Sequence, residues 1–488
     1  MLNRLLSRPR TLLLAAVVVF LLQALAFFTS RWVEDESWYS IRAATFLREG
    51  KIRNATFATA ADQVQLDASP PAMPLLLATS FKTLGCSVFS ARLPSLLAGI
   101  GVVIIAFMLG RLVGGVAVGG IAAFFVAADT FGFLAARCAR PEALITFFNV
   151  LALLLYLYAR APKRAWLAGA AGAATGIAIN IHPNGLATAA VIGLLVLFDC
   201  KLRFIREPRF WWFILPVVVL VAPDIYLLAT DAQIWATFKS QYLTRAGAPL
   251  AEKLSGELGR YAEFIGLTGG RGGFSLPIPV RLHVALAFVG ALGVLFRRQK
   301  TWFWVLLIAI IPHLLWWAYS VNKVSRYFAI ATPLIGVTIA AGIVALQTHT
   351  RAFRIAAVVG ALVVLSQLGG NAILIRRASS ADYSEVSREL RGLIPKGQAV
   401  YGAITFWMAL NDRPYWSYNR TQFGYMMEHL KAPYWILNDR VMMNGDGDGT
   451  TYDALRASAN AYAYAHGTLV GKVKSPFYGD LDVFRLNY

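Results

Sequence analysis

Long apolar runs recur through most of this chain, and they constrain its fold more than any other feature. The first covers 11–29, and the others lie at roughly 89–110, 116–134, 142–159, 166–181, 185–198, 210–229, 281–296, 302–318, 327–347 and 354–375. A helix needs about 20 apolar residues to cross some 30 Å of hydrocarbon, and most of these runs approach that length. The sequence therefore predicts a polytopic all-α membrane protein with about eleven transmembrane helices.

Composition agrees with this class. Hydrophobic residues make up 57% of the 488 residues and charged residues 15%, against about 45–50% and 25% in soluble domains. The three cysteines, Cys86, Cys138 and Cys200, lack the spacing of a zinc site or a disulfide framework. The run 11–29 is longer than the core of a signal peptide and has no small-residue cleavage site, so we expect it to remain as the first helix.

Basic residues are distributed unevenly between the loops. With a cytoplasmic N-terminus, most Lys and Arg residues of the short loops fall on the cytoplasmic side, mainly in 4–10, 160–164, 201–209, 297–300 and 351–354. The short loops of the other side hold only Arg137, Arg140, Lys323 and Arg326. This asymmetry follows the positive-inside rule. The formal net charge of +20 is therefore largely a topology signal, and we expect no nucleic-acid partner.

This orientation places three long segments outside the cytoplasm, namely 31–88, about 230–280 and the part after 376. The apolar run 71–84 is too short to span, so we expect an interfacial or re-entrant helix there. After 376, the stretches "QAVYGA", "APYWIL" and "LDVFRL" predict strands, and "DYSEVSREL" predicts a helix that Asp382 caps. We therefore expect a transmembrane module over 1–376, with 31–88 and 230–280 as its large outer loops, and an extracytoplasmic α/β domain over 377–488.

Ionisable and amide side chains gather toward the outer ends of the predicted spans. At about 1.5 Å of rise per residue, the outer half contains Asp129, Arg137, Arg140, Glu142, Asn180, His182, Asp224, Lys323 and Arg326, and the acids Glu34, Asp35 and Glu36 share this layer. A secondary transporter needs such groups near the midplane, often on broken helices, whereas the inner halves here are almost purely apolar. A site at the outer boundary suits a substrate with its tail in the bilayer. The alternative for each residue singly is that it holds helices together.

Six motifs occur in order within this frame: "VEDESWYSIRAATFLREG", "DASPPAMPLLLA", "SARLPSLLAG", "ARCARPEALITFFNVLALLLYLYA", "HPNGL" and "SRYFAIATPL". With them the chain resembles, over about residues 1–350, the GT-C glycosyltransferases that use polyprenyl-phosphate sugars, the superfamily of protein O-mannosyltransferases and lipid A aminoarabinose transferases. The resemblance implies a GT-C-like membrane fold and an enzyme of the bacterial inner (plasma) membrane. It would transfer a hexosyl or pentosyl unit, with inversion, on the extracytoplasmic face.

The resemblance also implies the partners. The donor would be a polyprenyl-phosphate-linked sugar, and the acceptor an envelope lipid, a glycan or a protein, with membrane lipids around the enzyme. The rival function is a lipid or polysaccharide flippase or transporter without catalysis, and a second rival is a non-catalytic membrane scaffold. Neither the sugar nor the acceptor follows from the sequence.

An inverting displacement needs a carboxylate as general base for the acceptor and positive charge on the departing phosphate. The acidic pair of the family matches Asp35 and Glu36, and we choose Asp35 as the base because repulsion between adjacent acids can raise a pKa. The alternative for Asp35 is the N-cap of an amphipathic helix from Ser37 to Glu49. Glu36 is left with three roles: orienting the helix, binding a metal, or contacting the acceptor. Glu34 is expected to be a solvated neighbour.

The second acidic site of the family matches Glu142, whose alternative is a first-turn carboxylate favoured by the helix dipole. The candidate phosphate-binding cations are Arg326, Lys323, Arg137 and Arg140. Arg326 is the first choice because arginine binds phosphate bidentately, and the alternative for each cation is interfacial anchoring. Candidate substrate or metal ligands are His182, Asn184 and Tyr327.

A divalent metal ion is an open question in this sequence. His182 could bind such an ion together with Glu36, and the alternative for His182 is a hydrogen-bonded loop residue. Ser69 stands where relatives often have a basic residue or histidine before the prolines. No acceptor-binding role is therefore carried over to Ser69.

Overall fold

The computed structural model describes residues 9–26, 28–57, 70–239, 249–268, 279–318, 325–379, 382–418, 423–438 and 449–488. They divide into two compact units, of which the first comprises 1–26, 68–73 and 95–374, and the second 27–67, 74–94 and 375–488. Lys323 and Ser69 lie outside the described residues. The domain division into 1–376 and 377–488 stays a prediction.

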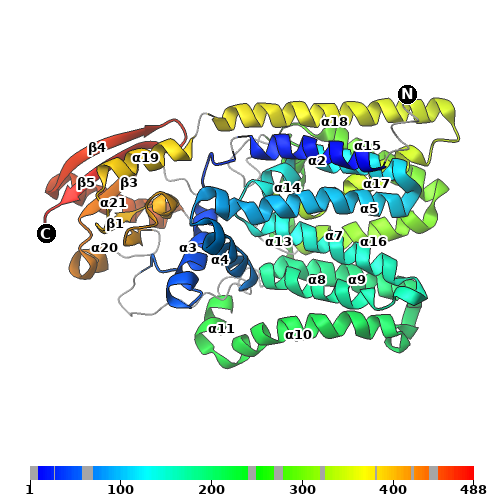
Figure 1. Ribbon diagram of the computed structural model, residues 1–488, viewed down its shortest axis with the longest axis horizontal. Coiled ribbons are helices and arrows are strands. Elements are labelled where there is room, and N and C mark those ends of the chain that lie inside the picture. Colours follow the sequence, from blue (N-terminus) through cyan, green and yellow to red (C-terminus); the bar gives the residue numbers. More distant parts are fainter. Residues whose placement is uncertain are drawn as a thin grey trace. The chain divides into compact units, whose positions relative to one another are not determined.

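The first unit consists of helices (Figure 1). In chain order they are α2 (Pro9–Leu25), α5 (Val88–Ala128, whose first residues belong to the second unit), α6 (Thr130–Ala136), α7 (Pro141–Ala159), α8 (Leu167–Ile181), α9 (Leu186–Cys200), α10 (Pro208–Thr230), α11 (Ala232–Phe238), α13 (Leu250–Ser255), α14 (Glu257–Phe264), α15 (Leu282–Arg298), α16 (Lys300–Ala318), α17 (Thr332–Val344) and α18 (Thr350–Ser379). Short 3-10 helices lie at η1 (Pro162–Arg164), η2 (Pro183–Gly185), η3 (Lys201–Arg206) and η5 (Ser325–Ile330). The described part of the first unit thus consists of helices joined by short connections.

Five segments of the described chain are long and apolar enough to cross a membrane: Val88–Ala128, Pro141–Ala159, Pro183–Arg206, Pro208–Thr230 and Thr350–Leu393. Shorter apolar helices lie at Pro9–Leu25, Ala72–Leu84, Leu167–Ile181, Lys300–Trp316 and Thr332–Val344. These lengths support a membrane protein. The count of about eleven spans stays a prediction.

Two of the predicted spans meet inside α5. The chain leaves the helical conformation at Gly114 and Gly115, and Gly115 has a φ of 83°, a left-handed value that favours glycine. A Cβ atom on Gly110 would lie 2.8 Å from the Cα atom of Gly119, so the backbones on either side of the kink are in close contact. The chain therefore reverses direction at this pair of glycines.

The second arm of α5 ends earlier than the sequence predicts. We expected one span over 116–134, but helix α5 stops at Ala128 and α6 begins at Thr130. Asp129 lies in the break with an extended backbone, and its side chain accepts a hydrogen bond of 2.7 Å from the backbone N–H of Gly132. Asp129 is therefore the N-cap of α6.

Polar side chains satisfy the carbonyl groups that this break exposes. Gln23 of α2 donates to the carbonyl of Ala127 at 3.0 Å, and Asn371 of α18 donates to that of Ala128 at 2.9 Å. The same Asn371 amide also donates to the Gln23 side chain at 2.8 Å. Unpaired backbone groups in an apolar bundle are costly, so these amides allow the helix to be discontinuous.

The second unit contains a mixed five-stranded sheet, drawn in orange to red in Figure 1. Its helices are α3 (Glu34–Glu49), most of α4 (Ala72–Leu84), α19 (Tyr383–Leu393), α20 (Phe423–Tyr425) and α21 (Gly449–His466), with η6 (Ile404–Leu410) and η7 (Met426–Leu430). The strands are β1 (Val400–Gly402), β2 (Tyr415–Ser417), β3 (Tyr434–Asn438), β4 (Gly467–Ser475) and β5 (Gly479–Leu486). The sheet order is β2-β1-β3-β5-β4, with β1 parallel to β2 and β3, and β5 antiparallel to β3 and β4.

Several local predictions are confirmed in this unit. The three apolar stretches form β1, β3 and β5, and the short run 71–84 forms α4. Asp382 caps α19, because its side chain accepts a hydrogen bond of 2.9 Å from the backbone N–H of Ser384. Strands β2 and β4 were not predicted. Trp435 and Tyr401 are fully buried between the sheet and its helices and form part of the core.

The segment that carries α3 is bonded to the sheet domain within this unit. The hydroxyl of Tyr478 donates to the carbonyl of Trp32 at 2.8 Å, and Arg48 of α3 donates to the carbonyl of Asn411 at 2.6 Å. The backbone N–H of Ser417, in β2, donates to the carbonyl of Thr56 at 2.9 Å. The C-terminal domain therefore holds both ends of the 31–57 segment.

Candidate functional site

One carboxylate and two guanidinium groups lie together in the first unit. Glu142 follows Pro141 in the first turn of α7 and is fully buried. Arg140, the residue before this helix, donates from Nη2 to Oε1 of Glu142 at 2.9 Å. The Nε atom of Arg326, in η5, lies 3.2 Å from the same oxygen. The sequence separation of Arg140 and Arg326 is large, yet both guanidinium groups share one carboxylate.

The charge of this cluster is unusual for the interior of an apolar bundle. Counted by itself, the Arg140–Glu142–Arg326 cluster has two positive charges and one negative charge, and the arginine side chains are only 4% and 5% exposed. Buried ions are costly unless they are paired, and here two guanidinium groups share one carboxylate. Arginine can bind a phosphate through two parallel N–H groups. The cluster is therefore suited to a phosphate group.

Three more of the predicted site residues lie near this cluster. His182, in the turn after α8, accepts a hydrogen bond at Nδ1 from the backbone N–H of Asn184 at 3.2 Å, and its ring centroid is 6.5 Å from that of Tyr327. Removal from water lowers the pKa of His182 to about 4, against an opposing effect of the Glu142 charge. The imidazole is therefore neutral at pH 7. The Asn184 side chain accepts a hydrogen bond of 3.3 Å from Trp316.

Of the other two predicted cations, the structure describes Arg137. Arg137, at the end of α6, is 5% exposed, and its guanidinium carbon lies 5.3 Å from the ring centroid of Phe133. This distance is within the range of a cation–π interaction. Lys323 belongs to the part of the chain that is not described. Of the four predicted cations, Arg140 and Arg326 thus meet at Glu142.

The acidic pair Asp35 and Glu36 belongs to the second unit. Helix α3 starts at Glu34, with Val33 as the N-cap, so Asp35 lies in the first turn. The alternative role of Asp35 as the N-cap is therefore wrong, because the helix begins three residues before the expected Ser37. Asp35 is half-buried, while Glu36 is fully buried.

Glu36 is held by an arginine that the sequence interpretation did not single out. Arg92 donates from Nε and Nη2 to the two carboxylate oxygens of Glu36, both at 2.8 Å, and Glu36 also accepts from the backbone N–H of Val33 at 3.1 Å. The Arg92 guanidinium further donates to the carbonyls of Ser30 and Arg31 at 2.7 and 2.9 Å. These contacts favour the helix-orienting role among the three predicted for Glu36.

A signal for Arg92 was present in the sequence. It lies in "SARLPSLLAG", at the start of the apolar run 89–110. An arginine in such a run is costly and needs a partner, which is a reason to look for a buried acid. The identity of that acid does not follow from the run itself.

The described residues do not fit a metal site. No group of three His, Cys, Asp or Glu side chains in the described part of the chain could hold a metal ion. Both oxygens of Glu36, one of the two expected ligands, accept hydrogen bonds from Arg92. No step of the mechanism proposed below uses a metal ion.

Comparisons with known proteins agree with this fold. Residues 68–227 match the family described as dolichyl-phosphate-mannose-protein mannosyltransferase. No curated protein matches the chain by sequence. Among solved structures, ArnT from Cupriavidus metallidurans in the apo state is similar at 13% identity, with a TM-score of 0.69 over 97% of this chain and 96% of that chain.

Two further structures carry a lipid phosphate. ArnT from Cupriavidus metallidurans bound to undecaprenyl phosphate is similar at 12% identity, with a TM-score of 0.70 and 97% of each chain covered. The archaeal oligosaccharyltransferase AglB from Archaeoglobus fulgidus, in complex with an inhibitory peptide and a dolichol-phosphate, has 12% identity and a TM-score of 0.52 over 97% of this chain and 74% of that chain. The family match and the shared fold confirm the resemblance of this chain to the GT-C glycosyltransferases.

Proposed function

We propose that this protein transfers a sugar from a polyprenyl-phosphate donor to an acceptor hydroxyl or amino group, with inversion at the anomeric carbon. The observation that carries the proposal is the Arg140–Glu142–Arg326 cluster. It gathers two buried guanidinium groups at one point of an apolar helical unit. A lipid phosphate supplies the anion that such a cluster favours and the hydrophobic tail that an apolar bundle accommodates.

The similar structures support the same class of donor. One of them is bound to undecaprenyl phosphate and another to a dolichol-phosphate. The identities are low, so the similarity supports the fold and leaves the chemistry to the residues of this chain. The proposed donor carries a hexosyl or pentosyl unit, and the proposed acceptor is lipid A, another envelope lipid, a glycan or a protein.

In the proposed reaction the acceptor oxygen or nitrogen attacks the anomeric carbon from the face opposite the phosphate. The bond between that carbon and the phosphate oxygen breaks, and its electron pair leaves with the polyprenyl phosphate. Asp35 takes the acceptor proton as general base. Arg326 and Arg140 stabilise the charge that develops on the phosphate, while Glu142 fixes the orientation of both guanidinium groups. His182, Asn184 and Tyr327 are proposed to contact the donor head group, with His182 acting as a neutral hydrogen-bonding partner.

The most direct test is a transfer assay on the purified, reconstituted protein. It uses undecaprenyl-phosphate sugars with labelled hexosyl and pentosyl groups, together with envelope lipid, glycan and protein acceptors. The proposal expects a labelled product whose anomeric configuration is opposite to that of the donor. A product with retained configuration would refute the single displacement, and consumption of no donor in any combination would refute the transferase function.

We further propose a cytoplasmic N-terminus and an extracytoplasmic C-terminal domain, which the uneven distribution of basic residues supports. Cysteine labelling in intact cells tests this topology, in a background without the native cysteines. A membrane-impermeant maleimide should label a cysteine at Glu385, an exposed residue of the C-terminal domain, and not one at Lys201. The reverse pattern would refute the orientation.

The rival function, a flippase or transporter, has one observation in its favour. The interruption of the helix at Asp129, beside a buried arginine, is the kind of feature that transporters use to bind substrates. Translocation of a fluorescent polyprenyl phosphate across proteoliposomes tests it. We expect no translocation above that of protein-free vesicles, because the polar groups at this break are engaged with Gln23, Asn371 and Arg281.

A further inference from the structure

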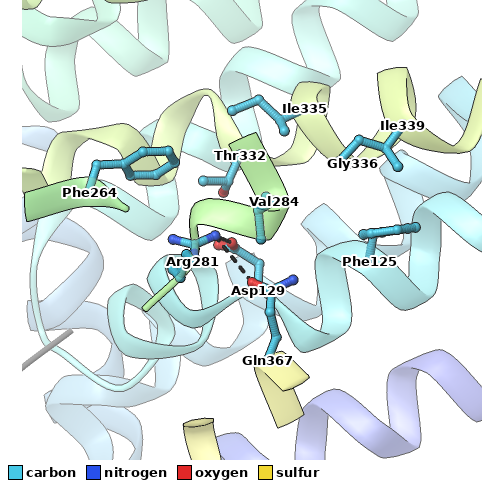
Figure 2. Close-up of a pocket in the computed structure, with 10 residues that line it drawn as sticks. All are labelled: Phe125, Asp129, Phe264, Arg281, Val284, Thr332, Ile335, Gly336, Ile339 and Gln367. Atoms are coloured by element: carbon cyan, nitrogen blue, oxygen red, sulfur yellow. Dashed lines mark hydrogen bonds and ion pairs between the residues drawn. The ribbon is translucent and has the colours of Figure 1, made fainter. Parts of the chain in front are cut away.

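A second buried ion pair in the first unit is not part of the proposed phosphate site. Arg281, just before α15, donates from Nη2 to Asp129 Oδ1, and at 3.2 Å to the Gln367 side chain of α18. Figure 2 shows these three side chains converging beside a small cavity. The cavity has room for about one water molecule, which is too little for a lipid head group or a sugar. The Asp129–Arg281 pair is therefore unsuited to binding the substrate itself.

The contacts of Arg281 lead toward η5. Its guanidinium carbon lies 4.9 Å from the ring centroid of Phe264, at the end of α14. The Phe264 ring in turn packs on that of Phe328, with centroids 4.3 Å apart. Phe328 belongs to η5, two residues after Arg326. A continuous set of packed side chains thus joins the ion pair to the element that presents Arg326.

The same pair also fixes the start of α6. The second carboxylate oxygen of Asp129 accepts the backbone N–H of Gly132, and the Phe131 ring of α6 lies 5.0 Å from the Arg281 guanidinium carbon. Helix α6 leads after a short turn to Arg140 and Glu142. The orientation of α6 therefore influences where those two side chains lie.

Arg281 is also anchored through its backbone. Its N–H donates to the carbonyl of Ile265 at 2.7 Å, directly after α14, so the backbone at Arg281 is bonded to the end of α14. This gives the described part of the 230–280 loop a role that its sequence did not reveal. Through Phe264, this loop segment packs against η5.

We propose that the Asp129–Arg281 pair is a positioning device that holds α6 and η5 together, so that Arg140 and Arg326 meet at Glu142. Asp129 acts by capping α6, and Arg281 acts through Phe131 on α6 and through Phe264 and Phe328 on η5. Asp129 and Arg281 are positioning residues, because neither contacts the proposed ligand. The assignment of a lipid phosphate as that ligand rests on the proposed function.

Binding of undecaprenyl phosphate to the purified full-length protein provides the first test. Arg281→Leu should weaken the affinity about 10-fold in the wild-type background, a typical size for coupling through packed side chains. In an Arg326→Ala background the same change should weaken the affinity much less, because only the route through Phe131 to α6 and Arg140 then remains. An equal loss of affinity in the two backgrounds would overturn the proposal. Such a loss would mean that Arg281→Leu weakens binding independently of Arg326, as a general structural defect does.

Two further variants accompany this test, one as a control and one as a second test of the route. Arg298→Leu changes an arginine at the other end of α15, where it contacts His349 at an exposed position, and it should leave the affinity unchanged. Phe264→Leu keeps the ion pair and removes the aromatic link to Phe328. Phe264→Leu should weaken the affinity for undecaprenyl phosphate as Arg281→Leu does, so it tests the proposal even if the Arg281→Leu protein fails to fold. Wild-type affinity in Phe264→Leu would overturn the proposed route from Arg281 to η5.

Hydrogen–deuterium exchange separates this inference from the proposed function. The amides of 325–330 and 130–136 should exchange faster in Arg281→Leu than in the wild type, and no faster in Arg298→Leu. Unchanged exchange at 325–330 in a folded Arg281→Leu protein would overturn the positioning role. If the wild type binds no undecaprenyl phosphate, the proposed ligand is wrong, and the exchange experiment still decides whether Arg281 holds η5.

Discussion

Two buried glutamates, one in each unit, are bound by arginine in different ways. Glu36 forms a bidentate pair with Arg92, in which one carboxylate matches one guanidinium group. Glu142 instead contacts the guanidinium groups of both Arg140 and Arg326. Both acids are fully buried, so the difference lies in the balance of charge and not in exposure.

This difference separates a structural role from a binding role. A matched pair has no net charge to offer a ligand, and Arg92 also donates to three backbone carbonyls before α3, as expected of a group that fixes a helix start. A carboxylate between two arginines orients both of them, and in the proposed site a phosphate would be their second anion. This contrast supports the proposal that the Glu36 pair stabilises the segment that carries Asp35, and that the Glu142 cluster binds the donor phosphate.

The largest effect on turnover should come from Asp35, the residue next to Glu36 of the Glu36–Arg92 pair. Asp35→Asn should lower kcat by about 100- to 10,000-fold, because the general base is lost while the side-chain shape is kept. Steady-state transfer kinetics and thermal unfolding of the purified protein measure the two effects separately. Glu34→Gln, a change of the adjacent acid, is the control and should retain near-normal turnover. Near-normal turnover in Asp35→Asn would refute its assignment as the base.

Breaking the Glu36–Arg92 pair should instead lower the free energy of unfolding. Arg92→Leu leaves a buried carboxylate without its cation and should cost about 3–5 kcal/mol of the free energy of unfolding. The double variant Glu36→Leu/Arg92→Leu should recover part of that loss, since it leaves no buried charge. Thermal unfolding in detergent provides the comparison. A single variant as stable as the wild type would show that the pair is not structural.

Removing the acid from the other cluster should have a different signature. Glu142→Gln should lower the stability of the ligand-free protein by about 1.5–3 kcal/mol, because hydrogen bonds to a charged group are lost. Undecaprenyl phosphate should then raise the Tm of this variant more than it raises that of the wild type, since both arginines become available to the anion. An equal or smaller rise would contradict the proposed balance of charge.

The smallest effect concerns pH. The pKa of His182 is lowered to about 4 in the folded protein, chiefly by removal from water, and lies near 6.5 when unfolded. Stability from neutral His182 is therefore present above pH 6.5 and is lost as the pH falls from there toward 4. Between pH 7 and 5 the wild type should lose about 2 kcal/mol more than His182→Gln. Parallel stability profiles of the two proteins would contradict the lowered pKa.

The sequence predicted much of the local structure. Apolar length located most of the helices, and a polar residue before an amphipathic stretch identified Asp382 as a cap, because these features depend on neighbouring residues alone. The motifs also identified Arg140, Glu142 and Arg326 as candidate residues. That Arg140 and Arg326 share the carboxylate of Glu142 was not predicted, since hydrophobic periodicity defines the buried face of a helix and not the helix that covers it.

The partners that are distant in sequence could not be predicted for the same reason. Arg92 is 56 residues from Glu36, and Asn371 is 243 residues from the carbonyl of Ala128 that it satisfies. The break at Asp129 depends on that amide and on Gln23 of α2, so no local pattern around 116–134 reveals it. Tertiary contacts decide whether an apolar run continues as one helix.

The binding of undecaprenyl phosphate to the wild type, to Arg326→Ala and to Arg160→Ala tests the central claim most directly. Arg160, just after the other end of α7, forms an ion pair of 2.8 Å with Asp199 away from Glu142, so it is a matched control. We predict that Arg326→Ala weakens the Kd by about 10- to 100-fold, while Arg160→Ala leaves it unchanged. Equal affinities of Arg326→Ala and the wild type would contradict the assignment of the Arg140–Glu142–Arg326 cluster as the donor phosphate site.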